Sequence, residues 1–516
     1  MSKSTFVVSS LEQLQTSLLG ARSQGKTIGL VPTMGALHQG HSSLIQRAVS
    51  QCDYVVVSIF VNPLQFAPQE DLAEYPRTLD DDAQLCEQLG ANLVFTPTMQ
   101  DLGISGDTTS QDTTTTIIPP QSMTLVMCGK YRPGHFAGVA TIVTKLFNIV
   151  CPDKAYFGQK DAQQLAIIRR LVRDLNMAVE IVPCPIIRET SGLALSSRNQ
   201  YLSEAEKSAA VILSNSLQQA LTTFRQGITE SASLIEKVKT TIATVPEVST
   251  QYVELVEPDT LEPLTTVTTK GLLAIAAYLG ETRLIDNILL RQPIVAIDGP
   301  AGAGKSSVTR RLAQELGLLY LDTGAMYRSV TWLAMDRGID VTDEAAIAQI
   351  IKGVTIELIP QVNPDLPVQV KVNGTEVTQA IRTPEVTANV STVAAQAAVR
   401  AELVTIQKSY GKTGGIVAEG RDIGTNVFPD AELKIFLTAT PRERARRRML
   451  DLENQGYKDI DVAKLEEEIK QRDLQDSTRA IAPLKKATDA VEIVTDNMSI
   501  EEVIAEITKL YGEIGN

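Results

Sequence analysis

The run Gly299-Pro300-Ala301-Gly302-Ala303-Gly304-Lys305-Ser306 has the residue types and spacing of a phosphate-binding loop. Glycines let the backbone N–H groups of such a loop face phosphate oxygens, and the start of the following helix adds a favourable potential. Lys305 would reach the β- and γ-phosphates as a catalytic cation, and the Ser306 hydroxyl would bind Mg²⁺. A predicted strand over 293–298 and a predicted helix from about Lys305 to Leu316 give this loop its expected context. The sequence therefore predicts an ATP site that extends through Ser307.

Two of the three histidines, His38 and His41, lie in Pro32-Thr33-Met34-Gly35-Ala36-Leu37-His38-Gln39-Gly40-His41, between a predicted strand and a predicted helix. The His-x-Gly-His spacing is similar to the HIGH signature of nucleotidyl-transferring α/β folds, in which imidazoles meet ATP phosphates at a helix start. An imidazole placed there donates to the α-phosphate as charge develops and pyrophosphate departs. The alternative for so short a motif is a turn with two structural histidines.

The elements that must position these groups alternate between strands and helices. Strands are predicted, in chain order, at residues 27–31, 54–61, 92–95 and 155–157. The unbroken apolar character of 54–61 suits a sheet buried on both faces, and a helix is predicted to begin near Ser42. This pattern predicts a doubly wound, Rossmann-like α/β domain over residues 1–185. The polar, Thr-rich stretch 107–116 predicts an exposed loop.

A second pattern covers residues 186–290 and predicts a small α+β domain. Residues 203–244 have helical periodicity, with Ser203 at a helix start, and strands are predicted at 252–256 and 272–278. A final apolar segment, Ile285–Leu290, precedes a junction predicted at Arg291-Gln292-Pro293. A new α/β domain over 291–516 begins there without a long linker.

Length and composition restrict the class of protein. A chain of 516 residues suggests two or three domains, and its net charge of −13 argues against a nucleic-acid partner. No apolar run approaches the roughly 18 residues that span a bilayer, so no membrane partner is expected. Met1–Val8 lacks the pattern of a signal peptide, which predicts a cytoplasmic location. The five scattered cysteines fit reduced thiols better than a disulfide framework or a zinc site.

Three motifs after the phosphate-binding loop decide among the P-loop classes. A GTPase would need a guanine-reading Asn-Lys-x-Asp, which the sequence lacks. Leu321-Asp322-Thr323-Gly324-Ala325-Met326-Tyr327-Arg328, Ala418-Glu419-Gly420-Arg421-Asp422-Ile423-Gly424-Thr425 and Arg472-Asp473-Leu474-Gln475-Asp476-Ser477-Thr478-Arg479 closely resemble bacterial cytidylate kinase, over residues 294 to about 513. The resemblance implies a P-loop nucleoside monophosphate kinase that uses ATP and Mg²⁺ to phosphorylate CMP or dCMP.

The same resemblance implies an acceptor site rich in arginine. Arg328, Arg400 and Arg421 would hold the phosphate of the nucleoside monophosphate, a task that suits the forked guanidinium. Ser391, Arg400 and Asp422 would surround the cytosine end, and Asp476 would hold the ribose hydroxyls. The residues implied for CMP are Thr323, Tyr327, Arg328, Ser391, Arg400, Arg421, Asp422, Asp476 and Arg479.

Two inserted segments complete the predicted kinase. Residues from about 325 to 400 match the enlarged monophosphate-binding insertion of the family, with a β-like part over 356–378 that turns at Asn373-Gly374. Residues from about 440 to 480 match the lid, and at least one of its arginines is expected to act on the transferring phosphoryl group. The alternative for the lid is a solvated charged helix. Gln475 stands where some relatives carry Arg, so the ribose-side network is expected to differ in detail.

Four further blocks accompany the two histidines in the first half of the chain. Phe60-Val61-Asn62-Pro63-Leu64-Gln65-Phe66, Arg132-Pro133-Gly134-His135-Phe136, Phe157-Gly158-Gln159-Lys160-Asp161-Ala162-Gln163-Gln164 and Leu195-Ser196-Ser197-Arg198-Asn199 resemble pantothenate synthetase (pantoate–β-alanine ligase), over about residues 5 to 285. The resemblance implies a two-step ligation. Pantoate attacks ATP to give pantoyl adenylate and pyrophosphate, and β-alanine then displaces AMP. The carboxylate is already ionised, so alignment and charge stabilisation would supply most of the rate.

The ligase resemblance also implies roles for single residues. His38, His41, Lys160 and Arg198 would be catalytic, with His41 a general acid-like donor. Gln65 and Gln164 would hold pantoate, with Gln65 also near β-alanine; capping of local backbone is the alternative for both. Asn62 is expected to shape its turn rather than touch substrate. The residues implied for ATP are Met34, Gly35, Ala36, Leu37, His38, Gln39, Gly40, His41, Gly158, Gln159, Lys160, Asp161, Ile187, Leu195, Ser196, Ser197 and Arg198, with Ile187 as a backbone contact to adenine.

Two other functions compete with this interpretation. A class I aminoacyl-tRNA synthetase shares the HIGH-like element but needs a downstream KMSKS loop, and only Met1-Ser2-Lys3-Ser4 is similar, at the wrong end of the chain. The second half could instead be a nucleotide sensor that binds without turnover. We expect small-molecule partners (pantoate, β-alanine, CMP or dCMP, and ATP) and a homo-oligomer, a dimer through the ligase half.

Overall fold

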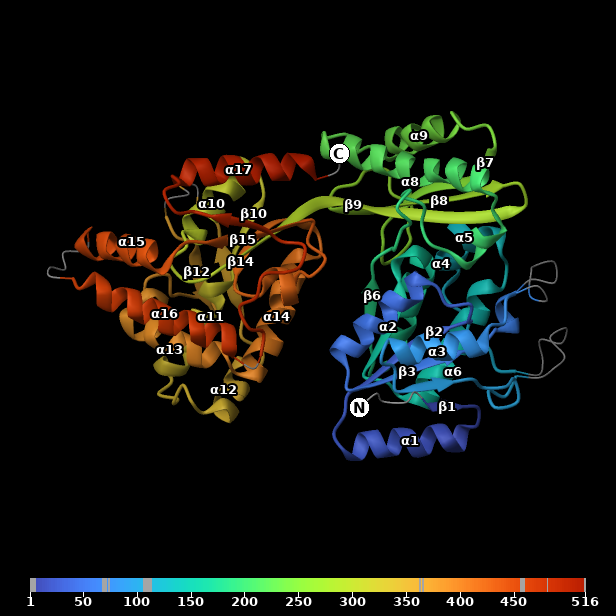
Figure 1. Cartoon of the computed structure of the whole chain (residues 1–516), viewed down its shortest axis with the longest axis horizontal. Helices are drawn as coiled ribbons and strands as arrows, with labels where there is room; N and C mark the ends of the chain where they lie inside the picture. Colours follow the sequence, from blue (N-terminus) through green and yellow to red (C-terminus); the bar gives the residue numbers. More distant parts are fainter. Residues whose placement is uncertain are drawn as a thin grey trace. The chain divides into compact units, whose positions relative to one another are not determined.

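The computed structural model describes residues 6–66, 72, 75–104, 114–361, 363, 366–454, 460–479 and 481–514. The chain divides into two compact units, Met1–Leu290 and Arg291–Asn516, which are described separately (Figure 1). Most of the predicted Thr-rich loop, and residues 455–459 and 480 of the predicted lid, lie outside the described residues.

The first unit contains a six-stranded parallel sheet in the order β1-β4-β3-β2-β5-β6. Its strands are β1 (Phe6–Val8), β2 (Ile28–Thr33), β3 (Tyr54–Ile59), β4 (Leu93–Phe95), β5 (Lys154–Gly158) and β6 (Glu180–Cys184). Its helices are α1 (Leu11–Ser23), α2 (Gln39–Gln51), α3 (Leu79–Gln88), α6 (His135–Val150) and α7 (Ala162–Asp174), with short turns α4 (Gln121–Thr124), α5 (Met127–Tyr131), η1 (Pro63–Gln65), η3 (Gln159–Asp161) and η4 (Ser197–Tyr201).

Burial on both faces of this sheet explains its unbroken apolar strands. Val56 belongs to a core cluster with residues of α1, α6 and α7, whereas its neighbours Val55 and Val57 belong to another with residues of α2 and α3. The four predicted strands of this domain and the doubly wound fold class are confirmed. Helix α2 begins at Gln39, upstream of the predicted start near Ser42, because His38 caps it with an imidazole, a cap that Ser, Thr, Asp and Asn more often provide.

The small α+β module follows in the same unit. It consists of α8 (Glu204–Arg225), α9 (Ser231–Ile242), β7 (Val248–Val256), β8 (Lys270–Leu279) and the first part of β9 (Thr282–Asp298). Ser203 and Glu206 form a capping box that begins α8, as predicted. Figure 1 shows α8 and α9 lying along the β7–β8 ribbon, and their apolar residues share one core cluster with that ribbon. The opposite face of the ribbon packs against residues of α4, α5 and α7.

The predicted junction at Arg291-Gln292-Pro293 coincides with the boundary between the two units, but it does not interrupt the strand. The separate segments expected on either side form one strand, because β9 continues from Thr282 to Asp298. Its later residues pair with β14 in parallel, and the register passes from Gly414↔Gln292 to Ile416↔Ile294. Gly415, opposite Pro293, has a positive φ of 68° and leaves this ladder. Pro293 has no backbone N–H to give, so the irregular partner is what allows a proline inside the strand.

The second unit contains the parallel strands β10-β14-β9-β15-β16, in that order. The strands other than β9 are β10 (Leu319–Asp322), β14 (Gly414–Gly420), β15 (Leu433–Thr438) and β16 (Val491–Val494). The helices are α10 (Lys305–Glu315), α11 (Thr323–Asp336), α12 (Glu344–Ile351), α13 (Pro384–Ala394), α14 (Ala397–Gly411), α15 (Pro441–Asn454), α16 (Val462–Thr478) and α17 (Ile500–Glu513), with short turns η5 (Ala380–Arg382) and η6 (Ile423–Val427). One core cluster packs α11 to α14 on the sheet, and another packs α10 and α17.

The predicted β-like insertion forms an antiparallel sheet of β11 (Ile356–Ile359), β12 (Gln369–Val372) and β13 (Thr375–Glu376). Its turn at Asn373-Gly374 has positive φ at both residues, as the sequence pair predicts. No helix within the described ranges is long and apolar enough to cross a membrane.

Candidate active sites

His38 and His41 present their Nε2 edges as hydrogen-bond donors at the start of α2. The Nδ1 of His38 accepts from the backbone N–H of Gly40 at 3.1 Å, and the Nδ1 of His41 accepts from the backbone N–H of His38 at 3.3 Å. Each neutral ring therefore carries its proton on Nε2. Burial, with Lys160 nearby, lowers the pKa of His38 to about 4. Burial, with His38 and Lys160 nearby, lowers the pKa of His41 to about 3, so both rings are neutral near pH 7.

The loop before the histidines is held by Asp82 of α3, which the sequence analysis missed. One oxygen of its buried carboxylate accepts from Ala36 N–H at 2.9 Å and the other from Leu37 N–H at 2.8 Å. These bonds stabilise a strained turn, since Ala36 has φ 49° and Gly35 has φ 85°. Asp80 and Asp81 precede Asp82 in the sequence, and only the fold shows which of the three turns inward.

Two adjoining cavities of about 260 and 210 Å³ open beside these histidines. The predicted ATP residues that line the larger one are Met34, His38, Gly40, His41, Gly158, Lys160, Asp161, Ile187, Leu195, Ser196, Ser197 and Arg198. Gly35, Ala36, Leu37, Gln39 and Gln159 line neither of these cavities. The two cavities meet at ten residues that line both, among them the predicted site residues Met34, His41, Asp161, Gln164 and Arg198.

The smaller cavity combines an apolar wall with polar groups. Its apolar side is formed by Phe60, Val139, Ile142, Val143 and Leu146. The amide of Gln65 donates to the Met34 sulfur at 2.7 Å and accepts from Asn62 at 3.2 Å. Asn62 also accepts from Leu64 N–H at 3.2 Å, so it shapes its turn as expected, although it lines the cavity as well.

Arg132 and His135 line both cavities, and their hydrogen bonds fix a tautomer. His135 Nδ1 lies 2.7 Å from the Gln65 carbonyl oxygen, which can only accept, so this nitrogen carries the proton. His135 Nε2 then accepts from Arg132 Nη1 at 3.1 Å. The sequence block containing these residues was noted, but no role was assigned to either.

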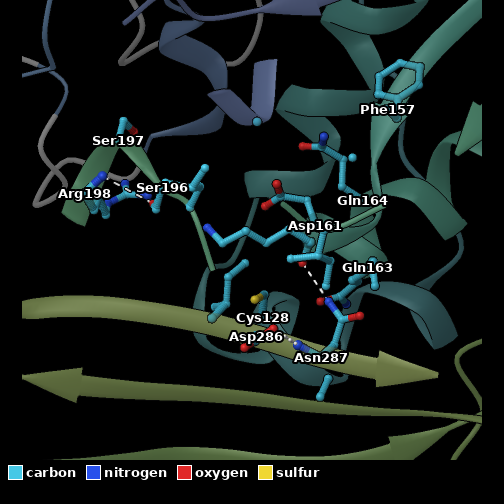
Figure 2. Close-up of a pocket in the computed structure, with 18 of the residues that line it drawn as sticks. Cys128, Phe157, Asp161, Gln163, Gln164, Ser196, Ser197, Arg198, Asp286 and Asn287 are labelled. Carbon is cyan, nitrogen blue, oxygen red and sulfur yellow. Dashed lines mark hydrogen bonds between the residues drawn. The ribbon is translucent and has the colours of Figure 1, made fainter. Parts of the chain in front are cut away.

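Lys160 and Arg198 approach the larger cavity from different segments. Burial lowers the pKa of Lys160, opposed by the nearby carboxylates of Asp161 and Asp286. Figure 2 shows the Ser196–Arg198 segment on one side of the pocket, with Asp286 and Asn287 on strand β9 along another. Asp286 and Asn287 were missed by the sequence analysis. Their signal is two adjacent polar residues, both buried, inside the otherwise apolar segment 285–290.

In the second unit the phosphate-binding loop joins β9 to α10, as predicted. Gly299, Gly302 and Gly304 have φ of 150°, 77° and 85°, and a Cβ at Gly299 would lie 1.9 Å from the Leu437 carbonyl oxygen. Lys305 is buried and donates to the carbonyl oxygens of Gly299 at 2.8 Å and Pro300 at 2.7 Å. Burial lowers the pKa of Lys305, and Arg421 lowers it further.

Glu419, at the end of β14, contacts the serine expected to bind Mg²⁺. Ser306 Oγ donates to Glu419 Oε2 at 3.0 Å, and the Tyr320 hydroxyl donates to the other carboxylate oxygen. Burial raises the pKa of Glu419. Glu419 belongs to a motif that the sequence analysis quoted, yet it was given no role there.

All nine residues implied for CMP line one cavity of about 720 Å³, together with Ala301 through Ser307. Gly299 and Pro300 do not line it. Arg400 pairs with Asp422, and Arg421 Nε donates to Asp476 Oδ2 at 3.0 Å. Arg472 also lines the cavity and was missed, although it lies one helical turn before Asp476 on α16. The Nε atoms of Arg328 and Arg472 are buried and lack a hydrogen-bond partner in the part of the chain that the structure describes.

Comparisons with known proteins identify a family for each of the two units. The family model of pantoate–beta-alanine ligase matches residues 6–289, and that of cytidylate kinase matches residues 295–513. The bifunctional pantoate ligase/cytidylate kinase of Synechocystis sp. is 60% identical over 503 residues, which cover 96% of this chain and 97% of that protein. Its counterpart in Acaryochloris marina is 59% identical over 489 residues, or 94% and 92% of the two chains.

This chain belongs to the bifunctional pantoate ligase/cytidylate kinase family. It is an enzyme with a ligase unit and a kinase unit, and both resemblances inferred from its motifs are confirmed. The crystal structure of pantothenate synthetase from Thermus thermophilus is 39% identical, with a TM-score of 0.52, and covers 56% of this chain and 100% of that one. The family assignment excludes both alternatives, an aminoacyl-tRNA synthetase and a nucleotide sensor without turnover.

A carboxylate at the end of β9 joins the two sides of the kinase cavity. Asp298 directly precedes the phosphate-binding loop, and its oxygens accept from Ile423 N–H at 2.8 Å and Gly424 N–H at 2.7 Å. Burial raises the pKa of Asp298 to about 6. Asp298 therefore links the ATP loop to the segment that carries Arg421 and Asp422, and the sequence analysis missed it.

The arginines of the kinase lid differ in their surroundings. Arg444 of α15 is buried, donates to the Ala301 carbonyl oxygen at 3.0 Å, and pairs with Asp473 of α16. Arg446 is largely exposed and pairs with Glu443. Arg447 lines the cavity and donates to the Thr495 hydroxyl at 3.0 Å. A direct role for a lid arginine in phosphoryl transfer stays a prediction, and the contacts favour Arg447 and Arg479 over Arg444.

Proposed function

We propose that the ligase unit condenses pantoate with β-alanine through pantoyl adenylate, with ATP in the larger cavity and pantoate in the smaller one. The observation that carries this proposal is the set of residues common to both cavities, among them His41, Gln164 and Arg198. A ligand in each cavity would meet the other at these side chains. The apolar wall of the smaller cavity suits the branched carbon skeleton of pantoate, and Gln65 and Gln164 supply amide groups for its oxygens.

In the first step, a pantoate carboxylate oxygen bonds to the α-phosphorus while the bond to pyrophosphate breaks. Negative charge grows on the phosphate oxygens, where the Nε2–H groups of His38 and His41 and the cations Lys160 and Arg198 would stabilise it. Because the folded protein lowers both histidine pKa values, these rings act as neutral donors and not as acids that release a proton. The expected acid-like role of His41 is thereby narrowed to hydrogen bonding.

In the second step, the neutral amine of β-alanine attacks the acyl carbon of pantoyl adenylate. A C–N bond forms, the bond from carbon to the phosphate oxygen breaks, and AMP leaves with the electron pair. The amine then loses a proton to give the amide. The donors used in the first step would stabilise the charge on departing AMP, so one set of side chains serves both steps.

For the kinase unit, we propose in-line transfer of the ATP γ-phosphoryl group to CMP or dCMP. The unpartnered Nε atoms of Arg328 and Arg472 support an anionic acceptor at that end of the cavity. Mg²⁺ fits beside Ser306 and Glu419, which supply the oxygen ligands that this ion prefers. The described residues hold no group of three or more His, Cys, Asp or Glu suited to a metal, so phosphates and water would complete the coordination. Bound Mg²⁺ neutralises the charge of the β- and γ-phosphates.

Two substitutions in the full-length chain test whether each activity depends on its own site. His41→Ala is expected to lower pantothenate formation by about 100-fold or more, the usual cost of removing one donor to a developing oxyanion, while CMP phosphorylation continues. Lys305→Ala is expected to do the converse, measured as ADP release with CMP present. Loss of both activities in either folded variant would contradict the assignment of these residues to separate sites.

We also propose that the protein is a cytoplasmic dimer that associates through the ligase unit. The oligomeric state rests on the family resemblance, and the compartment rests on the scattered cysteines, which fit reduced thiols. Light scattering of the full chain beside the isolated ligase unit tests the dimer, since both should dimerise.

A further inference from the structure

Asn287 reaches from the small α+β module of the ligase unit to the turn that carries Lys160. It lies on β9 with a side chain that is 6% exposed. Its Nδ2 donates to the Gln159 carbonyl oxygen at 3.1 Å and to the Lys160 carbonyl oxygen at 2.9 Å. A side-chain amide has two N–H donors, so both are spent on this one turn. Figure 2 shows Asn287 on β9, at the side of the pocket formed by the module.

Among the described residues, the turn that Asn287 contacts has no side-chain cap of its own. It is the single 3-10 turn η3 between β5 and α7, and neither Gly158 nor Asp161 provides a side-chain cap for the helical segment that follows it. Lys160 extends from this turn into the larger cavity, close enough to His38 and His41 to lower their pKa values. A small rotation of the turn would therefore move the ammonium group relative to the phosphates it is proposed to meet.

The preceding residue, Asp286, supports the other nucleotide segment indirectly, through Arg188. Its 3% exposed carboxylate accepts two hydrogen bonds from the Arg188 guanidinium, at 2.6 and 2.9 Å. Arg188 also donates to the Gly192 carbonyl oxygen at 3.1 Å, inside the hairpin that leads to Leu195 and the segment ending at Arg198. Of these two successive residues, Asn287 contacts one segment of the proposed ATP site directly, and Asp286 supports the other through Arg188.

We propose that Asn287 is a positioning residue of the ligase reaction, which sets the place of the Lys160 ammonium through the carbonyl groups of its turn. The inference rests on the role proposed above for Lys160. Asn287 is not a catalytic residue in this proposal, because both of its N–H donors bind protein carbonyl groups and neither binds substrate. The small module is then part of the catalytic apparatus and does more than cover the nucleotide domain.

A double-mutant cycle in the full-length chain tests this proposal. Asn287→Ala is expected to lower the ligase kcat by about 10- to 100-fold, the cost of misplacing a catalytic group by a fraction of an ångström to about 1 Å. The KM for pantoate should change by less than about 3-fold, because Asn287 lies outside the smaller cavity. If Asn287 acts through Lys160, adding Asn287→Ala to Lys160→Ala should cost less than about 2-fold more. CMP phosphorylation by the same preparations reports the amount of folded kinase unit, and thermal unfolding followed by circular dichroism reports whether the ligase unit is folded.

Matched variants keep the test decisive if Asn287→Ala folds poorly. Asn287→Asp has the same size but no N–H donors, so it should reproduce the loss of kcat. Asn92→Ala removes another structural asparagine, whose side chain accepts from Val55 N–H at 2.8 Å. Asn92 lines neither cavity, so this variant should keep the ligase kcat within about 3-fold of the parent.

Two results would overturn the proposal, and they are distinguishable. If Asn287→Ala lowered the ligase kcat by the same factor in the parent and in the Lys160→Ala variant, Asn287 would not act through Lys160. The proposed ligase site would still stand. Full ligase activity in Lys160→Ala would instead refute the proposed role of Lys160, and the positioning inference would fall with it.

Discussion

At the scale of single residues, backbone hydrogen bonds in the ligase site fix the tautomer of two histidines, and so determine which ring nitrogen can donate to a ligand. The two imidazoles at the start of α2 accept from backbone N–H groups through Nδ1, so only their Nε2–H groups remain for a ligand. Burial and the neighbouring Lys160 keep both rings uncharged. The motif therefore supplies neutral donors, and the positive charge of the site comes from other residues that line the cavities, among them Arg132, Lys160 and Arg198. The histidines thus provide oriented hydrogen-bond donors, and other side chains provide the positive charge.

The histidine pKa values predict how the ligase unit responds to acid. Unfolded histidine titrates near its usual pKa of about 6.5, whereas the folded pKa values are about 4 for His38 and about 3 for His41. Between these limits the unfolded chain binds more protons, so the free energy of unfolding should fall as pH drops from about 6.5 toward 4. His38→Asn and His41→Asn should each weaken this dependence.

Selective isotope labelling makes the same prediction visible by NMR. With three histidines in the chain, the ring signals are few enough to assign with His38→Asn and His41→Asn variants. Between pH 8 and pH 5 the His38 and His41 signals should move by no more than about a tenth of their full titration shift, because the folded pKa values are about 4 and about 3. A midpoint near pH 6.5 for either ring would contradict the neutral-donor model.

At the scale of elements, buried carboxylates connect the loops of the sites to neighbouring helices and strands through hydrogen bonds. Asp82 connects α3 to the loop before α2, and Asp298 connects the end of β9 to η6. Each carboxylate accepts hydrogen bonds from two backbone N–H groups. These groups lie where the chain is irregular and would otherwise lack the partners that a helix or sheet provides. Removing one acceptor leaves a buried N–H without a partner, which costs about 1–3 kcal/mol.

Asp298→Asn is expected to impair the kinase and spare the ligase. Its amide has one acceptor oxygen for the two N–H groups of Ile423 and Gly424, so the segment carrying Arg421 and Asp422 should shift. We expect kcat/KM for CMP to fall by about 10- to 100-fold, from the cost of one unpaired N–H. Asp489→Asn is the matched control, since that aspartate is exposed and pairs only with Lys434 in the described structure. An equal effect in both variants would argue against a positioning role for Asp298.

At the scale of the whole molecule, the unit boundary falls inside β9. The strand supplies Asp286 and Asn287 to the ligase unit and Asp298 to the kinase unit, although the contact boundary lies between Leu290 and Arg291. The Thermus thermophilus pantothenate synthetase matches the ligase part over its full length, so a separate chain of this kind does fold. The ligase unit should need the first part of β9 and nothing beyond it.

Truncation tests this requirement. A chain of residues 1–290 should retain pantothenate formation, because Asp286 and Asn287 and their partners are all present. A chain of residues 1–281 should lose it, because β9 and both polar residues are removed. Circular dichroism separates loss of activity from loss of fold. Inactivity of a folded 1–290 chain would show that the ligase depends on the second unit.

The features that could be predicted from the sequence are those that depend on contiguous residues. The phosphate-binding loop, the His-x-Gly-His turn and the kinase motifs depend on backbone conformation and donor spacing within a few residues, so their chemistry is readable without a fold. The apolar strands and the capping box at Ser203 depend on local periodicity and local hydrogen bonds in the same way. Confirmed predictions of this kind include the doubly wound fold and the helix that begins at Lys305.

The isolated polar residues that complete these sites could be identified only from the fold. Asp82, Asn287, Asp298 and Glu419 each act through hydrogen bonds to segments remote in the sequence, and a lone Asp, Asn or Glu has no spacing that announces such a partner. The continuity of β9 through Pro293 was missed for a related reason, since a proline is tolerated where the neighbouring strand is irregular. Local patterns state what a segment can do, whereas a long-range hydrogen bond exists only when packing brings its two ends together.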